Sequence, residues 1–253
     1  MIQIEAHKRN FLTPLFTKHD HLQTIIHAIL DTEMGTAVTD DPANPNVAKL
    51  SLEFNFLGGK VAHPAAKELV QDLSGTAVVP NRQWRNLIYD IHGEKVKINH
   101  RYACDGSKLD IDHLQPLVDK LNPEFTIHTV DHALAAQIRD DVTPDLIDNF
   151  GSVEAFINHG FGFCVVQNET GRIVCGASTF AVCGHDIEVE IDTHPDFRRM
   201  GLATAVAAHM LIHCLQNNLT PHWDGHNPTS ARLAQRLGYK ITSSYETYYI
   251  SPN

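Results

Sequence analysis

The sequence predicts an α/β chain of the α+β type, in which helices flank a mixed, mostly antiparallel sheet. Three observations lead to this fold class: a run of three strand patterns around the turn Asn168-Glu169-Thr170-Gly171, a helix pattern directly after it, and a strand, helix and strand at the C-terminal end. In chain order, these segments are 161–167, 172–181, 186–193, 201–217, 220–224, 228–237 and 240–250.

The segment from Pro195 to Ala203 joins the third of these strands to the helix that follows. In the strand, Ile187, Val189 and Ile191 alternate with acidic residues, which is the period of a half-buried strand. A glycine at the junction, Gly201, allows the backbone to approach a ligand closely, and the first amides of a helix have no partner within it. The sequence therefore predicts a phosphate-binding loop at this helix N-terminus.

A second element lies in residues 222–239. Asn227 is a good N-cap, Pro228 is preset for the first helical position, and Gly238 stands where a left-handed C-terminal cap is needed. We therefore expect a short strand, a capped helix and a clear helix end at this point.

The N-terminal half predicts helices and strands in the order α-β-β-α-β, with no phosphate loop. We expect its role to be structural or to shape the substrate site. A boundary near residues 121–124 divides the chain into domains 1–122 and 123–253. The expected segments are helices at 18–31, 64–73, 82–91 and 111–121, strands at 35–40, 47–56, 76–79 and 96–102, and helical pieces over 131–150 and from Ser152.

The phosphate loop and the capped helix together resemble the acyl-CoA core of the GCN5-related N-acetyltransferases, the GNAT family. The loop of that family, Gln/Arg-x-x-Gly-x-Gly/Ala, is matched by Arg198, Gly201 and Ala203. Its later Asn, small residue and closing Leu-Gly-Phe/Tyr look like Asn227, Ser230 and residues 237–239, so the resemblance covers residues 126–250. The stretches Glu-x-Glu-Ile-x-Thr and Trp-Asp-x-x-Asn-x-x-Ser look more narrowly like a two-domain bacterial branch that includes zwittermicin-type resistance acetyltransferases.

The resemblance implies a sheet that is splayed between strands 186–193 and 220–224, with acetyl-CoA in the gap. The α-β-β-α-β order of the N-terminal half is reminiscent of a degraded GNAT-like half. The resemblance also implies direct transfer of the acetyl group to the amine of a small molecule, with an oxyanion donor from the backbone of the strand before the loop. The residues implied to bind the cofactor are Ile191, Asp192, Thr193, Arg198, Arg199, Met200, Gly201, Leu202, Ala203, Thr204, Asn227 and Ser230.

Three residues compete for the role of the base that takes a proton from the attacking amine. Glu188 and Glu190 lie on the strand expected to splay, where family members often use a carboxylate, and Glu188 is preferred. His222, on the following strand, is the rival. Each of them has a structural alternative as a solvated or packed side chain.

The general acid is the point at which this chain departs from the family. Many relatives place a tyrosine seven residues after the Asn, and this chain has Ala234 there. Tyr245, Tyr248 and Tyr249 on the last strand are the candidates, with Tyr245 preferred. The alternative is a thiolate that leaves without help.

Composition excludes several classes of protein. A net charge of −10 opposes nonspecific binding of nucleic acid. No apolar run reaches the roughly 20 residues that span a bilayer, and the start of the chain lacks the order of a secretory signal, so we expect a cytoplasmic protein without a membrane partner. The five cysteines form no C-x-x-C pair, which favours reduced thiols, and we expect no metal site among the scattered histidines.

Two alternatives remain open at this stage. Because the tyrosine is absent, a noncatalytic acyl-CoA-binding or regulatory module remains an alternative. Release of free thiol with any amine would exclude it. The family usually ends on two strands, whereas residues 240–250 leave room for only one, so one sheet edge would be bare. We expect the N-terminal domain, or a second subunit in a homodimer, to cover that edge.

Overall fold

The computed structural model describes residues 1–252, and these form two compact units. Unit 1 contains Met1–Arg101 and the C-terminal residues from Ser244, and unit 2 contains Tyr102–Ser243. The expected domain boundary at residues 122 and 123 falls inside unit 2, because the helix Ile111–Val118 packs against the long helix Leu202–Gln216. In the described chain, no helix has the length and apolar character to cross a membrane.

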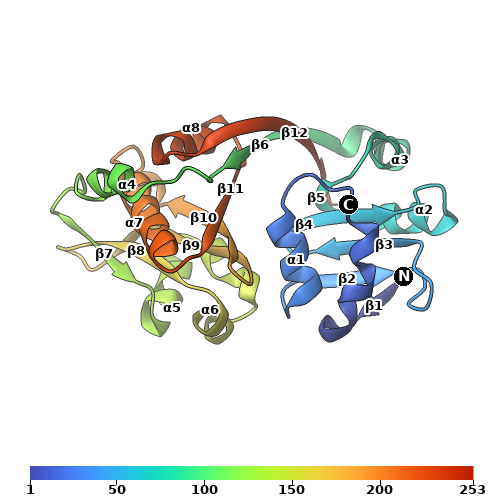
Figure 1. The fold of residues 1–253 in the computed structure, drawn as a ribbon, viewed down its shortest axis with the longest axis horizontal. Coiled ribbons are helices and arrows are strands. Elements are labelled where there is room, and N and C mark those ends of the chain that lie inside the picture. The colour runs from blue at the N-terminus through green and yellow to red at the C-terminus, as the bar shows by residue number, and fades with distance from the viewer. Residues whose placement is uncertain (253) are drawn as a thin grey trace. The chain divides into compact units, whose positions relative to one another are not determined.

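Unit 2 contains a sheet with helices on both faces (Figure 1). The order of its strands is β6-β11-β10-β9-β8-β7, and every neighbouring pair is antiparallel except β10 and β11. The elements, in chain order, are β6 (Val96–Asp105), α4 (Ile111–Val118), β7 (Phe125–Thr129), α5 (His132–Asp141), the 3-10 turns Pro144–Leu146 and Asp148–Phe150, α6 (Val153–His159), β8 (Gly162–Gln167), β9 (Ile173–Cys183), β10 (Asp186–Thr193), the 3-10 turn Pro195–Phe197, α7 (Leu202–Gln216), β11 (Thr220–Gly225), α8 (Pro228–Leu237) and β12 (Lys240–Ile250).

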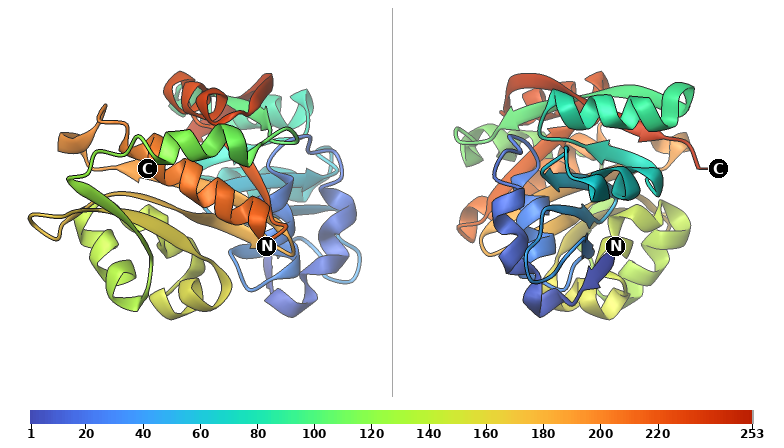
Figure 2. Two further views of the ribbon diagram at one scale, coloured as in Figure 1. Left: turned by 60° about the vertical axis from the view of Figure 1, so that its left-hand side comes forward. Right: turned by 90° about the vertical axis from the view of Figure 1, so that its right-hand side faces the viewer.

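The core of unit 2 lies on both faces of this sheet. Ile187 of β10 packs with Leu202, Val206 and Met210 of α7 on one face. On the other face, Ile138 of α5 belongs to a cluster that includes residues of α6, β8 and β9. Figure 2 shows α4 beside α7, with α5 and α6 across the sheet from them.

Unit 1 also contains a sheet with helices, and its strand order is β1-β2-β3-β4-β5-β12. The predicted strand 47–56 is wrong, because these residues form two strands joined by a tight turn in which the Leu52 amide donates to the Phe54 carbonyl. The elements are β1 (Ile2–Ile4), the 3-10 helix Ala6–Leu15, α1 (Gln23–Asp31), β2 (Thr36–Thr39), β3 (Val47–Ser51), β4 (Phe54–Gly59), α2 (Pro64–Gln71), β5 (Gly75–Val78), α3 (Arg82–His92) and the 3-10 turn Gly93–Lys95.

The two units share one order of elements. Each has a strand, helical segments, a three-stranded antiparallel meander, a helix, a strand parallel to the last strand of the meander, and a further helix. The final strand is exchanged: β6 follows α3 in sequence and pairs with β11 in unit 2, whereas β12 follows α8 and pairs with β5 in unit 1. One sheet edge was expected to be covered by the N-terminal domain or by a second subunit; in the structure β6, which lies within residues 1–122, pairs with β11.

The equivalent strands of the two units differ in their pairing. In unit 1, Thr76 and Ala77 of β5 pair with β4 on one side and with β12 on the other, so the sheet is continuous there. In unit 2, Thr220–His222 pair with β10 and Trp223–Gly225 pair with β6, so no residue of β11 is paired on both sides. In unit 1, Leu57–Gly59 of β4 also run beyond β5 and pair with β3 alone, so the two units differ in the double pairing of β5 and not in the parting of the two parallel strands.

Candidate functional site

The split in unit 2 begins at a defined residue pair. β10 and β11 run side by side from Asp186 to Glu188, where Glu188 is the register partner of His222. Beyond this pair, Val189–Thr193 continue along β9 only, and the register with β9 shifts between Glu188 and Val189. Such an irregularity re-aims a strand and ends its pairing. The predicted splay between these strands is confirmed, and one edge of β10 has peptide groups with no neighbouring strand in the described chain.

The loop after β10 ends at the N-terminus of α7. Arg199 and Gly201 both have left-handed backbone conformations, with φ of 66° and 84°. No side chain caps α7, so the first-turn amides of Leu202, Ala203 and Thr204 have neither a helical acceptor nor a capping acceptor. A Cβ built on Gly201 would meet no atom within 4 Å, so the backbone there faces open space. These are the features of an anion site.

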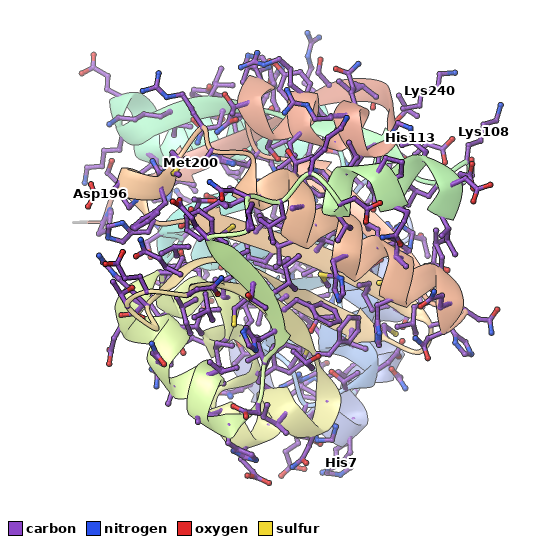
Figure 3. All side chains as sticks on the ribbon, turned by 90° about the vertical axis from the view of Figure 1, so that its left-hand side faces the viewer. His7, Lys108, His113, Asp196, Met200 and Lys240 are labelled. Atoms are coloured by element: carbon purple, nitrogen blue, oxygen red, sulfur yellow. The ribbon has the colours of Figure 1, made fainter. Side chains whose placement is uncertain are left out.

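Two other loop side chains point outward. Figure 3 shows Asp196 and Met200 projecting from the surface of unit 2. Met200 is 48% exposed although it is a large apolar residue. Its side chain adds nothing to the core, so the structure is consistent with a backbone contribution from this residue.

Arg198 differs from the rest of the predicted cofactor residues, because its guanidinium is engaged within the protein. Its Nε donates to the Thr193 carbonyl at 3.0 Å, and its Nη2 lies 3.6 Å from the Asp192 carboxylate. Asp192 Oδ1 also accepts from the Thr193 amide at 2.7 Å. These contacts fasten the loop to the end of β10.

The two candidate carboxylates lie on opposite sides of the point where the strands part. Glu188 is the last paired residue and is 6% exposed, whereas Glu190 is half-buried and lies two residues further along β10. Glu190 is the register partner of Ser178, whose hydroxyl donates to the Leu146 carbonyl at 2.7 Å. Both side chains face away from α7, because the intervening Val189 packs toward it.

His222 lies beside Glu188 but is bound elsewhere. Its Nε2 is 2.8 Å from Asp186 Oδ1, and about half of each side chain is exposed. This pair lies on the closed side of the split. The structure therefore gives His222 a cross-strand partner of its own.

Asn227 and Ser230 hold the fold of α8 and its neighbouring strand. Asn227 Oδ1 accepts from the amides of Thr229 and Ser230 at 2.8 and 2.9 Å, which confirms the predicted N-cap. The Ser230 hydroxyl accepts from the indole of Trp223 at 3.1 Å. Gly238, with φ of 106°, forms the predicted C-terminal cap. The cofactor role of Asn227 and Ser230 stays a prediction, since these contacts already explain why the two residues are there.

The candidate tyrosines lie on β12 as expected, and their role as acid stays a prediction. Tyr245 belongs to unit 1, where its ring stacks on His21 with centroids 3.9 Å apart. Tyr248 is buried in the core of the same unit. In unit 2, the sequence analysis gave no role to the Tyr239 hydroxyl, which donates to the Pro221 carbonyl at 3.0 Å. Burial, followed by nearby thiols and the charge of Glu188, raises the pKa of Tyr239 well above its usual value.

Four of the five cysteines are not poised as nucleophiles: Cys104, Cys164, Cys175 and Cys214. Burial raises the pKa of Cys104 to about 11, and the charges of Asp224 and Glu188 add to this effect. Burial also raises the pKa values of Cys164, Cys175 and Cys214 to about 12. Because the thiolate is the reactive form, these groups are inert at neutral pH.

One histidine pair on α7 has the i, i+4 spacing of helical metal ligands, which the search of the sequence did not identify. His209 and His213 stand four residues apart on α7, as helical metal ligands do, and both rings contact Phe163, with centroids 4.7 and 5.3 Å from it. Burial lowers the pKa of His209. Residues 1–252 contain no group of three His, Cys, Asp or Glu side chains arranged to hold a metal ion.

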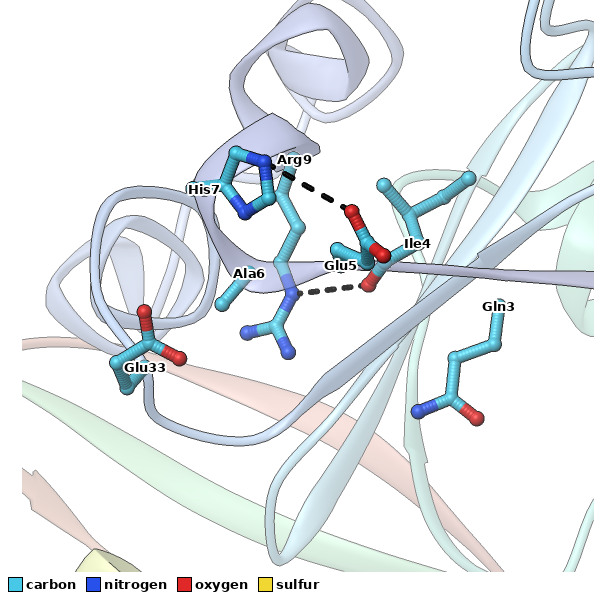
Figure 4. A pocket seen from close by; sticks show the side chains of 7 residues that line it. All are labelled: Gln3, Ile4, Glu5, Ala6, His7, Arg9 and Glu33. Carbon is cyan, nitrogen blue, oxygen red and sulfur yellow. Dashed lines mark hydrogen bonds and ion pairs between the residues drawn. The ribbon is translucent and has the colours of Figure 1, made fainter.

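A cavity of about 500 Å³ lies in unit 1 (Figure 4). No loop like the one before α7 lines it. The buried Arg9 guanidinium there donates to the carbonyls of Ile29, Met34 and Gly35 at 3.0, 2.7 and 2.9 Å. These hydrogen bonds satisfy backbone carbonyls around the end of α1, so we regard the cavity as structural. It is lined by Gln3, Ile4, Glu5, Ala6, His7, Arg9 and Glu33.

Comparison with known proteins gives consistent matches over nearly the whole chain. The family described as GNAT acetyltransferase matches residues 13–248, so the match begins far before the expected start at residue 126. The chain is 36% identical over 255 aligned positions to the uncharacterized N-acetyltransferase YdfB of Bacillus subtilis, covering 89% of this chain and 90% of the relative.

Solved structures agree with this assignment. A GCN5-related N-acetyltransferase-like protein from Streptococcus suis superposes with a TM-score of 0.85 at 32% identity, covering 97% of this chain and 99% of that one. A GCN5-related N-acetyltransferase from Kribbella flavida shares the fold, with a TM-score of 0.59 at 13% identity and coverage of 90% and 93%. The split sheet, the uncapped helix N-terminus and these matches lead to one assignment: the chain belongs to the GNAT acetyltransferase family, and it is an acetyltransferase.

Proposed function

We propose that this protein transfers an acetyl group from acetyl-CoA to the amine of a small molecule. The proposal rests on two features, an open strand edge and an uncapped helix N-terminus. They lie on consecutive elements of unit 2. The open edge of Val189–Thr193 leads directly into the loop before α7, and the uncapped amides of α7 follow it.

The phosphate end of acetyl-CoA suits the start of α7. The amides of Leu202, Ala203 and Thr204 provide donors, and the helix dipole adds partial positive charge. Gly201 keeps the approach clear. The open edge of β10 around Ile191 suits the amide-containing arm, because an extended ligand can pair with an exposed strand edge.

Glu188 is the base we propose. A neutral amine nitrogen attacks the thioester carbonyl, a C–N bond forms, and the C–S bond breaks with its electron pair going to sulfur. Glu188 accepts the proton that the nitrogen releases, and the thiolate takes a proton from solvent. The place of Glu188 at the split and its burial support this role, while Glu190 and His222 remain the rivals.

Direct transfer is favoured over a covalent acyl-enzyme. The charge of Glu188 acts on the Cys104 thiol, whose pKa burial raises to about 11. A nucleophile of that kind would be protonated at neutral pH. We therefore propose a ternary complex of protein, acetyl-CoA and amine.

A small cationic acceptor is consistent with the charge of this part of the chain. Residues 126–253 hold seven Lys and Arg against fourteen Asp and Glu. The excess of carboxylates attracts cations and repels nucleic acid. We propose that the thiolate leaves without an assisting acid, and Tyr245 stays the alternative.

The test is a panel of small primary amines incubated with acetyl-CoA and the protein. The proposal predicts amine-dependent release of free thiol and an acetylated amine in the mass spectrum. Binding of acetyl-CoA without thiol release for any amine would support a noncatalytic module instead.

A further inference from the structure

The Arg198 guanidinium lies at the start of the phosphate loop and makes its contacts with the protein itself. It donates to the Thr193 carbonyl at 3.0 Å and lies 3.6 Å from the Asp192 carboxylate, although the side chain is 59% exposed. The Asp192 carboxylate is held in turn by the Thr193 amide. Both partners belong to the end of β10, so the two contacts join the loop to that strand.

The residue after it is strained. Arg199 has φ of 66°, a left-handed conformation that is unfavourable for a residue with a side chain. This left-handed turn, with that at Gly201, directs the chain into α7 so that its first amides face outward. A strained turn persists only when its surroundings hold it.

We propose that Arg198 is a positioning residue, whose guanidinium holds the phosphate loop against the end of β10 and makes no direct contact with the phosphates of acetyl-CoA. This inference rests on the proposed function. The neighbouring Arg199 provides a matched comparison, because its side chain is exposed and no hydrogen bond or ion pair to its guanidinium is found in residues 1–252.

The test measures acetyl-CoA affinity by calorimetry for Arg198→Ala, Arg198→Lys and Arg199→Ala at low and high salt. A positioning role needs the planar fork of arginine, so both Arg198 variants should weaken binding by about tenfold or more. Their salt dependence should equal that of the wild type. Arg199→Ala should weaken binding less and reduce the salt dependence, since it removes an exposed charge.

A second arm couples Arg198 to Asp192. Asp192→Asn keeps an acceptor for the Thr193 amide but removes the charge that faces Arg198. The effect of Arg198→Ala on affinity should be smaller in the Asp192→Asn background, because the two residues act through one contact. Circular dichroism of each variant checks the fold.

Three results would overturn the proposal: wild-type affinity in Arg198→Ala, full rescue by Arg198→Lys, or an undiminished effect of Arg198→Ala in the Asp192→Asn background. Full rescue by Arg198→Lys and an undiminished effect in the Asp192→Asn background are the results expected if Arg198 contacts the phosphates directly through its charge. Failure of the proposed function would look different, because the wild-type protein itself would then show no binding of acetyl-CoA.

Discussion

Glu188 of β10 and His222 of β11 are register partners, and they are the last such pair before the two strands part. Their side chains share one face of the sheet, but they have different surroundings. Glu188 is 6% exposed, whereas the His222 imidazole is half exposed and bound to Asp186. The closed end of the split therefore holds one buried carboxylate and one solvated histidine pair, which favours Glu188 as the group that meets the amine.

Gly201→Val should weaken the binding of acetyl-CoA at least tenfold, or about 1.4 kcal/mol. The side chain would strain a residue with φ of 84° and would occupy the open space before α7. Gly184→Val is the matched control, because Gly184 has φ of 61° and equally open surroundings but lies in the turn before β10. Calorimetry should show weaker binding only for Gly201→Val, and equal affinities in both variants would contradict this account.

Asn227→Ala should lower the free energy of unfolding by about 1 kcal/mol, since it removes the N-cap of α8. Asn227→Asp keeps the accepting oxygen and should retain that stability. Comparing Asn227→Ala with Asn227→Asp separates the role of Asn227 as the N-cap from its predicted contact with the cofactor. If the Asn227 amide nitrogen binds acetyl-CoA, the Asp variant will be as stable as the wild type but will bind more weakly in calorimetry.

The chain should bind one acetyl-CoA. Unit 1 has the same order of elements as unit 2, but its β5 is paired on both sides. The His63 side chain also accepts from the Ala65 amide, so the helix that corresponds to α7 is capped. A calorimetric stoichiometry of two per chain, or binding that survives in Gly201→Val at half the wild-type stoichiometry, would show that unit 1 has a site of its own.

The buried thiols predict a loss of stability at alkaline pH. The usual pKa of a cysteine is 9.0, whereas burial raises that of Cys175 and Cys214 to about 12. Between these values the unfolded chain releases thiol protons that the folded protein retains, so the free energy of unfolding should fall as pH rises above about 9. Urea denaturation at pH 8 and pH 10 measures this. Cys175→Ala should reduce the difference, and an unchanged slope would exclude Cys175 as a cause.

The local patterns predicted the elements around the site. The caps of α8 at Asn227 and Gly238, the strand β10 and the start of α7 follow from short-range sequence signals, and the structure confirms them. The hairpin of β3 and β4 was missed because Leu52 and Glu53 reverse the chain without a glycine or proline. A continuous apolar pattern therefore concealed a turn.

Long-range relationships were beyond the sequence patterns. The pairing of β6 with β11 and of β12 with β5 joins residues more than a hundred positions apart, and no local signal encodes it. No local signal encodes the hydrogen bond from the Tyr239 hydroxyl to the Pro221 carbonyl either, although these residues are only 18 positions apart. Arg198 matched a family motif, yet its contacts with Thr193 and Asp192 depend on the path of the loop, which a motif does not specify.

The most direct test of the account is the steady-state kinetics of Glu188→Gln with an amine that the wild-type protein acetylates. Glutamine keeps the shape and hydrogen bonding of the side chain but cannot accept the proton. The account predicts that kcat falls roughly 10²-fold or more while the affinity for acetyl-CoA is unchanged. A near-normal kcat in Glu188→Gln, with the loss seen in His222→Ala instead, would contradict it and would move the base to β11.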